Sequence, residues 1–239
     1  MRPSVAGPKE LRERPEGYRA LLRQMIESQA YREISAANLF GHSLKFVDDL
    51  ALKREIVHDL EEEIEHYQAT VSLYRDAGFG DVAEAIRDRL GRVPYPESWL
   101  ELSVAQFLYD RAGKFHLREY RECSYLPYAK AVTRILEEEE QHEDFGAKFL
   151  QRFCADPSGR PKAQALFDRW LGVALLSFGR PGTAGNAAAI ESGLKGRDSG
   201  EVMKEFLEDI KPTMRACGLA FPPREAVGVE LPPDVAWRL

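Results

Sequence analysis

Apolar residues recur at steps of three and four positions through most of the chain, a pattern that is typical of amphipathic helices. The first run predicts a long helix from about Glu16 to Lys45, and the next predicts one from about Leu52 to Ala77, where Gly78 provides a left-handed stop. Later runs predict further helices over about Asp81–Leu90, Glu97–Arg121, Tyr128–Cys154, Lys162–Phe178 and Glu201–Cys217. Strand patterns are nearly absent, so we predict an all-α fold.

Proline and glycine mark the limits of this helical region. We expect residues 1–15, which are rich in proline, arginine and glutamate, to form a flexible tail, and residues 16–217 to form one helical domain. The glycine-rich stretch 179–200 is expected to be a loop. Residues 218–239 are proline-rich with two isolated apolar patches, which predicts an extended arm over the helices or over a partner.

Composition limits the classes of function. Of the 239 residues, 44% are apolar, which is ample for a packed core. The formal net charge is −6, from 33 basic and 39 acidic residues, so we expect no nucleic-acid partner. The chain has no run of about 18 apolar residues and no signal-peptide core, which predicts a cytoplasmic protein without a membrane segment. Cys123, Cys154 and Cys217 lack the spacing of a zinc or redox motif and are expected to be buried thiols.

Three histidines follow a glutamate by three positions, in the pairs Glu55/His58, Glu63/His66 and Glu139/His142. Residues spaced in this way lie about 60° apart around a helix and about 4.5 Å apart along it, so both side chains can bind one ion. A single pair is weak evidence, because glutamate is abundant here and an exposed acidic face is the more frequent explanation. We expect Glu137, Glu138 and Glu140, which surround Glu139, to form such a solvated face.

Single carboxylates on the preceding helices strengthen two of these pairs. Glu33 precedes Glu63 by 63 − 33 = 30 positions, and Asp110 precedes Glu139 by 139 − 110 = 29 positions. In two antiparallel hairpins these separations place all four carboxylates at one level, as in dimetal carboxylate bundles. The pair Glu55/His58 has no carboxylate at an equivalent separation that is matched in the second hairpin, so it is rejected as a metal site. The predicted metal ligands are Glu33, Glu63, His66, Asp110, Glu139 and His142.

Burial of four carboxylates without cations would cost many kcal/mol, so the site is expected to hold two divalent ions. Carboxylate and imidazole ligands without a thiolate suit iron, and manganese is the alternative. The two Glu-x-x-His glutamates would bridge the ions, and the remaining carboxylate and histidine of each hairpin would bind one ion. Open positions between the ions would admit dioxygen.

The stretch CSYLPYAKAVTRILEEEEQH, residues 123–142, resembles the Cys-Ser-Tyr-x-Pro-Tyr-Ala-basic segment that leads into Glu-x-x-His in the phenylacetic acid catabolic family of ferritin-like proteins. The similarity runs from about Pro15 to Pro223 and includes the segments of Glu33, Glu63 and Asp110. It implies a ferritin-like four-helix bundle and a di-iron monooxygenase that epoxidises or hydroxylates an organic substrate with O2, for instance an aromatic acyl-CoA such as phenylacetyl-CoA. It also implies an oligomer with a ferritin-like sister subunit, and electrons from a separate iron-sulfur flavoprotein reductase.

Two positions depart from the pattern of that family. The lysine found there one turn before the first bridging glutamate is Asp59 here, and the glycine before the histidine is Glu65. Loss of a cation beside the metals changes the local charge balance, and this weakens the inference about the substrate.

Three other functions compete with the oxygenase. A ferritin-like ferroxidase or iron-binding protein would need the same ligands but neither reductase nor substrate tunnel, and the long C-terminal extension counts against it. A non-catalytic partner subunit of an oxygenase should lack the ligands that this chain retains. A tRNA-hydroxylating relative would want a basic face, which the acidic composition does not favour.

Overall fold

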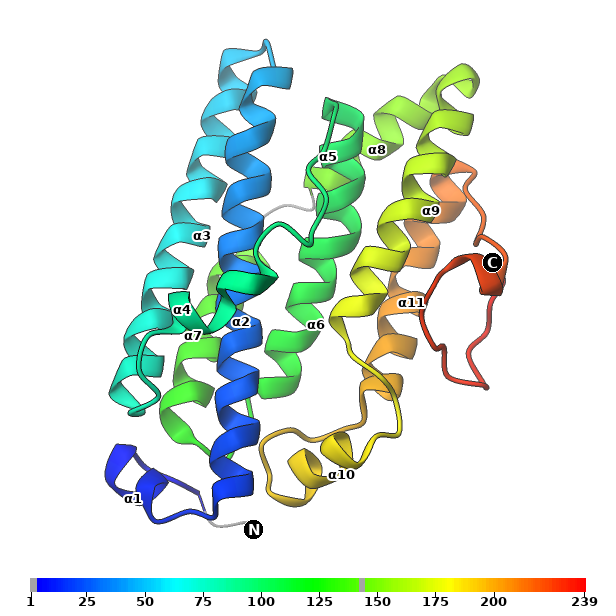
Figure 1. The fold of residues 1–239 in the computed structure, drawn as a ribbon. Helices are drawn as coiled ribbons and strands as arrows, with labels where there is room; N and C mark the ends of the chain where they lie inside the picture. The colour runs from blue at the N-terminus through cyan, green and yellow to red at the C-terminus, as the bar shows by residue number, and fades with distance from the viewer. Residues whose placement is uncertain (1–3, 142–144) are drawn as a thin grey trace.

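The computed structural model describes residues 4–141 and 145–239, and these form an all-helical protein (Figure 1). Within those ranges the only strand-like pairing is an isolated bridge between Val5 and Tyr125. The prediction of an all-α, ferritin-like helical bundle is therefore confirmed. No helix of the described part is long and apolar enough to span a bilayer.

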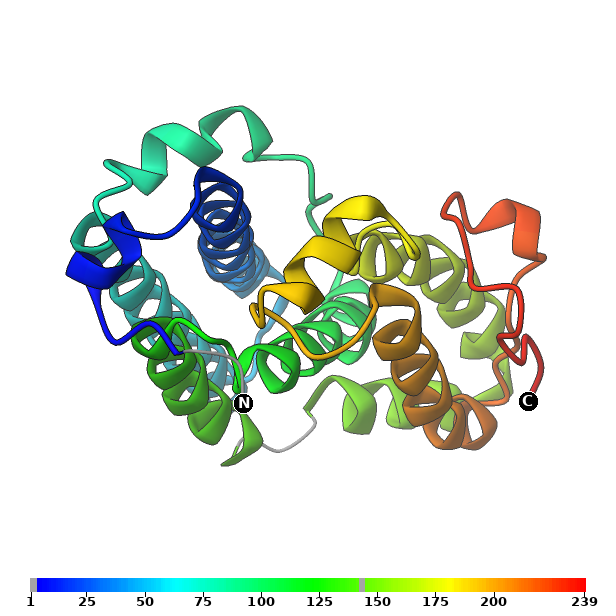
Figure 2. The same ribbon diagram turned by 90° about the horizontal axis from the view of Figure 1, so that it is seen from below.

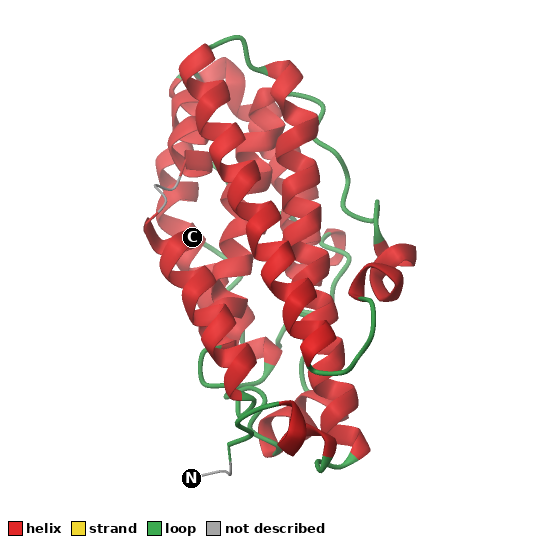
Figure 3. Ribbon diagram, turned by 90° about the vertical axis from the view of Figure 1, so that its left-hand side faces the viewer, coloured by secondary structure: helices red, strands yellow, loops and turns green. Residues whose placement is uncertain are grey.

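The first hairpin of the bundle consists of α2 (Glu16–Ser43) and α3 (Leu50–Asp76), which lie side by side along their length (Figures 1 and 3). The carboxylate of Asp49 caps the start of α3 by accepting a hydrogen bond from the Leu52 amide at 2.9 Å. Gly78, with a φ of +81°, follows the end of α3, as the sequence predicts. This hairpin carries two of the candidate carboxylates at mid-length.

The second hairpin begins with α5 (Trp99–Ala105) and α6 (Arg111–Tyr120), which are joined by one π-helical turn, η3 (Gln106–Asp110). It returns through α7 (Leu126–Gln141), which packs against α6 and α3 and closes the four-helix bundle (Figure 2). A π-helical turn inserts a residue into an otherwise regular helix and is frequent at functional sites. Here that turn ends at Asp110, one of the predicted ligands.

The sequence predicts one helix over 128–154, and the structure describes helix on both sides of residues 142–144, in α7 and in α8 (Phe145–Ala155); residues 142–144 lie outside the described part. Whereas α7 belongs to the bundle, α8 packs against α5 and against the C-terminal helices α9 (Arg160–Ser177) and α11 (Ser199–Cys217). The close approach of α8 to the π-helical turn depends on Gly146. A Cβ atom at Gly146 would lie 2.5 Å from the backbone nitrogen of Phe107 and 2.7 Å from the carbonyl oxygen of Ser103.

A second apolar core lies between α5, α8, α9 and α11, beside the bundle (Figures 1 and 2). Trp170, Phe206 and Leu207 are fully buried in it. The stretch predicted to be a glycine-rich loop contains a helix, α10 (Ala184–Glu191), so that prediction is wrong for its middle part. The Thr183 hydroxyl caps α10 by accepting a hydrogen bond from the Asn186 amide. The remaining short helices are η1 (Leu44–Phe46), α4 (Val82–Ile86), η2 (Arg87–Arg89) and η4 (Pro157–Gly159).

Both ends of the chain pack on the helices. Residues 4–15, expected to belong to a flexible tail, include α1 (Pro8–Arg12), and the side chains of Val5 and Leu11 are buried against the bundle. The sequence did not predict this packing, because most of the other residues in this stretch are charged or proline. The predicted C-terminal arm contains a short helix, η5 (Arg224–Ala226), and lies over α9 and α11, with Val227 and Val235 buried.

We predict that Gly146→Ala destabilises the protein by about 1–3 kcal/mol, because the new methyl group would overlap backbone atoms that cannot move independently. Urea unfolding followed by circular dichroism measures this change. The matched control is Gly41→Ala at an exposed position of α2, where the nearest atom outside the helix would lie 3.9 Å from the new methyl group, and a gain of about 0.5–1 kcal/mol is expected. Equal effects at the two glycines would contradict the close packing of α8.

Candidate metal centre

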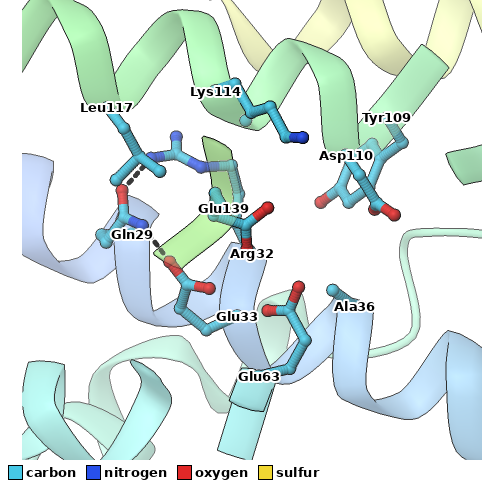
Figure 4. Close-up of a pocket in the computed structure, with 11 residues that line it drawn as sticks. Gln29, Arg32, Glu33, Ala36, Glu63, Tyr109, Asp110, Lys114, Leu117 and Glu139 are labelled. Atoms are coloured by element: carbon cyan, nitrogen blue, oxygen red, sulfur yellow. Dashed lines mark hydrogen bonds between the residues drawn. The ribbon is translucent and has the colours of Figure 1, made fainter. Parts of the chain in front are cut away.

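Four carboxylates from four different helical segments line one cavity in the bundle (Figure 4). Glu33 comes from α2, Glu63 from α3, Asp110 from the end of η3 and Glu139 from the last turns of α7. The cavity encloses about 360 Å³ of space, part of which is continuous with solvent. The matching separations in the sequence therefore correspond to one level in the bundle, as expected.

His66 belongs to the same cluster and is only 3% exposed. Its Nδ1 atom lies 3.7 Å from a carboxylate oxygen of Glu33 and 3.7 Å from one of Glu139. Its Nε2 atom forms a 3.0 Å hydrogen bond with Glu138 on the opposite side of the ring. Glu33, Glu63 and His66 each offer one ligand atom, and these atoms lie within 4.8 Å of one another. The ring is thus oriented with Nδ1 toward the carboxylates.

The two remaining histidine predictions have different outcomes. His142 lies outside the described residues, so its role as a ligand stays a prediction. His58, which is not among the predicted ligands, has a side chain that is 67% exposed and lies 3.7 Å from Glu62 on its own helix. His58 therefore faces away from the cluster.

The proximity of the carboxylates raises the pKa of two of them. Burial raises the pKa of Glu63 well above its ordinary value, and the charges of Glu33 and Glu139 raise it further. Burial and the charge of Glu139 raise the pKa of Asp110, and the nearby ammonium group of Lys114 opposes this shift. Without cations, the cluster would hold protons in place of metal.

The residues present fit a pair of divalent ions. One carboxylate oxygen of Glu63, Oε2, and the Nδ1 atom of His66 are buried without a hydrogen-bond partner. Buried polar atoms of this kind usually have a partner in native proteins, and a metal ion would supply it here. Oxygen and imidazole donors without a thiolate suit iron or manganese.

Glu138 was expected to belong to a solvated face with partners on its own helix, and it has such a partner in Arg134, but it also contacts His66. Its carboxylate accepts a hydrogen bond from Arg134 at 2.9 Å and is the 3.0 Å partner of His66, with the side chain 33% exposed. A carboxylate on the outer nitrogen of a metal-binding histidine fixes the tautomer of the ring and strengthens the ligand. Glu137 is exposed, and the side chain of Glu140 lies outside the described part.

Sequence reasoning also missed a polar chain on α2 that holds Glu33. The Gln29 side-chain amide donates a hydrogen bond to Glu33, and the Arg32 guanidinium donates one to the Gln29 carbonyl oxygen. Gln29 and Arg32 line the cavity together with Tyr109 and Lys114 (Figure 4). Gln29 precedes Glu33 by four positions, and Lys114 follows Asp110 by four. This helical spacing is the signal that could have identified both residues.

Comparisons with known proteins place the chain in a family. Residues 54–230 match the model of a family described as phenylacetic acid catabolic protein. The chain is also 23% identical over 220 residues to one of the subunits of 1,2-phenylacetyl-CoA epoxidase from Escherichia coli (strain K12). That match covers 87% of this chain and 71% of the relative.

We predict that His66→Ala and Glu139→Ala each abolish stoichiometric metal binding, because both remove a donor that faces the cluster. Glu138→Ala should weaken metal binding by about 10- to 100-fold, since it removes only the group that orients His66. Metal content after dialysis and affinity for Mn(II) measure these effects. The control variants are His58→Ala and Glu137→Ala, which should bind metal like the wild type. Loss of metal in either control would mean that the ligands are wrongly assigned.

The raised pKa values of Glu63 and Asp110 predict how the metal-free protein responds to pH. An unfolded carboxyl loses its proton near pH 4, whereas the folded state keeps these two protons to higher pH. The free energy of unfolding of the metal-free protein therefore declines as the pH rises from about 4 toward the folded-state pKa values. The slope should be at most about 1.4 kcal/mol per pH unit for each group. Thermal unfolding in EDTA between pH 5 and 8 should show this loss in the wild type and a smaller one in Glu63→Gln. Identical slopes for the two proteins would contradict the assignment.

Proposed function

Because the chain belongs to the family of phenylacetic acid catabolic proteins, we propose that it is the catalytic subunit of a di-iron monooxygenase. The reaction would use O2 to epoxidise or hydroxylate an organic substrate. The observation that carries this proposal is the cluster of four carboxylates that line the cavity of the bundle, with the buried imidazole of His66 beside them. The relative in Escherichia coli belongs to 1,2-phenylacetyl-CoA epoxidase, so an aromatic acyl-CoA such as phenylacetyl-CoA is the first substrate to test.

The proposed ligand set divides between the two hairpins. Glu33 and His66 would hold one iron and Asp110 and His142 the other, with Glu63 and Glu139 between them; manganese could replace iron in the same site. When bound, a reduced pair of irons supplies the electrons that activate O2 for transfer of one oxygen atom to the substrate. A position for the centre inside the bundle is supported by the burial of Glu33, Glu63 and His66.

The protein residues around the centre would hold its ligands in place. Glu138 accepts a hydrogen bond from the Nε2–H group of His66, and this tautomer leaves the lone pair of Nδ1 for a metal ion. Gln29 and Arg32 restrain Glu33 from the other side of the cavity. Tyr109, which is 5% exposed, and Leu117 contribute the less polar part of the lining and limit access of water. Such restraint reduces the reorganisation that the centre needs during turnover.

The proposed partners are an iron-sulfur flavoprotein reductase and a ferritin-like sister subunit. The chain itself contains only three cysteines, all buried and distant in sequence, and so offers no set for an iron-sulfur cluster of its own. Electrons must therefore come from another protein. A cytoplasmic location and the absence of nucleic-acid and membrane partners stay predictions.

The two alternatives, a ferroxidase or a partner subunit, are less well supported. A ferroxidase needs the carboxylate cluster but no donor for a substrate oxygen, whereas Arg32 and Lys114 also line this cavity. A partner subunit without chemistry has no need of four clustered carboxylates, whose burial is costly.

The test uses protein loaded with ferrous iron and supplied with O2, a flavoprotein reductase, NADPH and phenylacetyl-CoA. We expect about two irons per chain, an absorption change on exposure to O2, and an oxygenated product with 18O from 18O2. The Glu63→Ala variant is the matched negative control. The ferroxidase would be favoured by two results together. Iron would be oxidised at the same rate with and without reductase and substrate, and no oxygenated product would form from a panel of acyl-CoA thioesters. A protein that takes up no metal would favour the partner subunit.

A further inference from the structure

Two cationic side chains share the cavity with the four carboxylates. Arg32 is 8% exposed and is held by Gln29. Lys114 lies one turn beyond Asp110 on α6 and is partly buried, and its ammonium group points into the cavity toward Tyr109 and Asp110 (Figure 4). Within residues 4–141 and 145–239, Lys114 forms no ion pair within 4.0 Å. Its charge is therefore available to a group that enters the cavity.

The charge balance of the cavity becomes positive when metal binds. Without metal, the four carboxylates outnumber Lys114 and Arg32, and protons held by the cluster reduce the negative excess. Two divalent ions would cancel the four carboxylates and leave the positive charges of the lysine and the arginine unopposed. An excess of positive charge in a partly enclosed cavity favours an anionic or strongly dipolar oxygen as the next ligand.

The two cations are not equivalent in this respect. The guanidinium of Arg32 already donates to Gln29, and Gln29 donates to Glu33, so Arg32 belongs to the framework of the site. Lys114 has a flexible side chain with three donor protons and no such commitment. Lys114 is therefore the better candidate for contact with a substrate.

We propose that Lys114 positions the substrate by donating a hydrogen bond to its acyl oxygen, the oxygen of a carbonyl or carboxylate group. This inference rests on the proposed function, since it assigns a role in substrate binding within the same site. It places the acyl group at the α6 side of the cavity, next to Tyr109 and across from Glu63. Lys114 is a positioning residue here, and no proton or electron transfer is assigned to it.

The role of Lys114 predicts two effects of opposite sign in Lys114→Met. Binding of divalent metal should become about three- to thirty-fold tighter, because a positive charge beside the ions is removed. Binding of phenylacetate and phenylacetamide to the iron-loaded protein should become about ten-fold weaker or worse, because their shared acyl oxygen loses its donor. If Lys114 had only a structural role, its substitution would weaken both metal binding and ligand binding. Opposite changes in the two affinities therefore distinguish substrate positioning from a structural role.

The experiment measures Mn(II) affinity of the metal-free protein, and then ligand binding to the iron-loaded protein, by isothermal titration calorimetry. Lys114→Arg should keep both affinities within about three-fold of the wild type, and Lys114→Gln serves as a second neutral variant if Lys114→Met is unstable. Lys162→Met, at an exposed position of α9, is the matched control and should change neither. Ethylbenzene, which has no acyl oxygen, should bind the wild type and Lys114→Met equally.

Unchanged affinity for phenylacetate and phenylacetamide in a fully loaded Lys114→Met protein would overturn this inference and leave the proposed function intact. A parallel loss of metal and ligand binding in both neutral variants would also overturn it, since it would show a structural role. A wild-type protein that binds no metal would instead overturn the proposed function, and the metal content measured at the outset distinguishes that case.

Discussion

Mutual repulsion between four clustered carboxylates, two of them buried and two partly buried, is the constraint on which this structure depends. Glu33, Glu63, Asp110 and Glu139 come from separate helical segments and meet in one cavity, where burial disfavours their charged forms. A bundle can tolerate such a cluster only if cations or protons neutralise it. The positions of the long helices, the orientation of His66 and the nearby cationic side chains are all consistent with neutralisation by metal.

The rest of the fold keeps the helices of the cluster in place. Glu101, near the start of α5, accepts hydrogen bonds from Arg169 at 2.8 Å and from the Trp170 indole at 3.0 Å. This contact ties the segment that carries Asp110 to the C-terminal helices and their own apolar core. None of the predicted ligands that the structure describes belongs to that core, which instead fixes the segment beside Asp110.

The first hairpin and the placement of its two carboxylates were the most predictable part of the protein. Glu33 and Glu63 lie on long, regular helices, and the separation between them is enough to infer that they meet. The contact of Glu138 with His66 was missed because a run of four glutamates gives no sign of which one faces a histidine on another helix. Asp110 was correctly paired with Glu139, although the π-helical turn that carries it has no recognisable sequence pattern. The close approach of α8 to the π-helical turn was not predictable, because nothing in the sequence shows that Gly146 meets the backbone of that turn.

The structure also shows which cationic side chains lie beside the carboxylates, and the sequence alone does not. The structure places the ammonium group of Lys114 in one cavity with Glu33 and Glu63, which belong to the other hairpin. The sequence shows only that Lys114 follows Asp110 by four positions, and it does not show that this lysine meets the carboxylates of the first hairpin.

The proposed chemistry depends above all on two metal ions held by the carboxylate cluster between the hairpins. The most direct measurement is X-ray diffraction at the iron absorption edge from crystals of the protein loaded with ferrous iron. We expect two anomalous peaks in the cavity, one on each side of Glu63 and Glu139, with His66 Nδ1 bound to one of them. Absence of both peaks from a crystal grown with saturating iron, or peaks only at surface carboxylates, would contradict a dimetal centre in this protein.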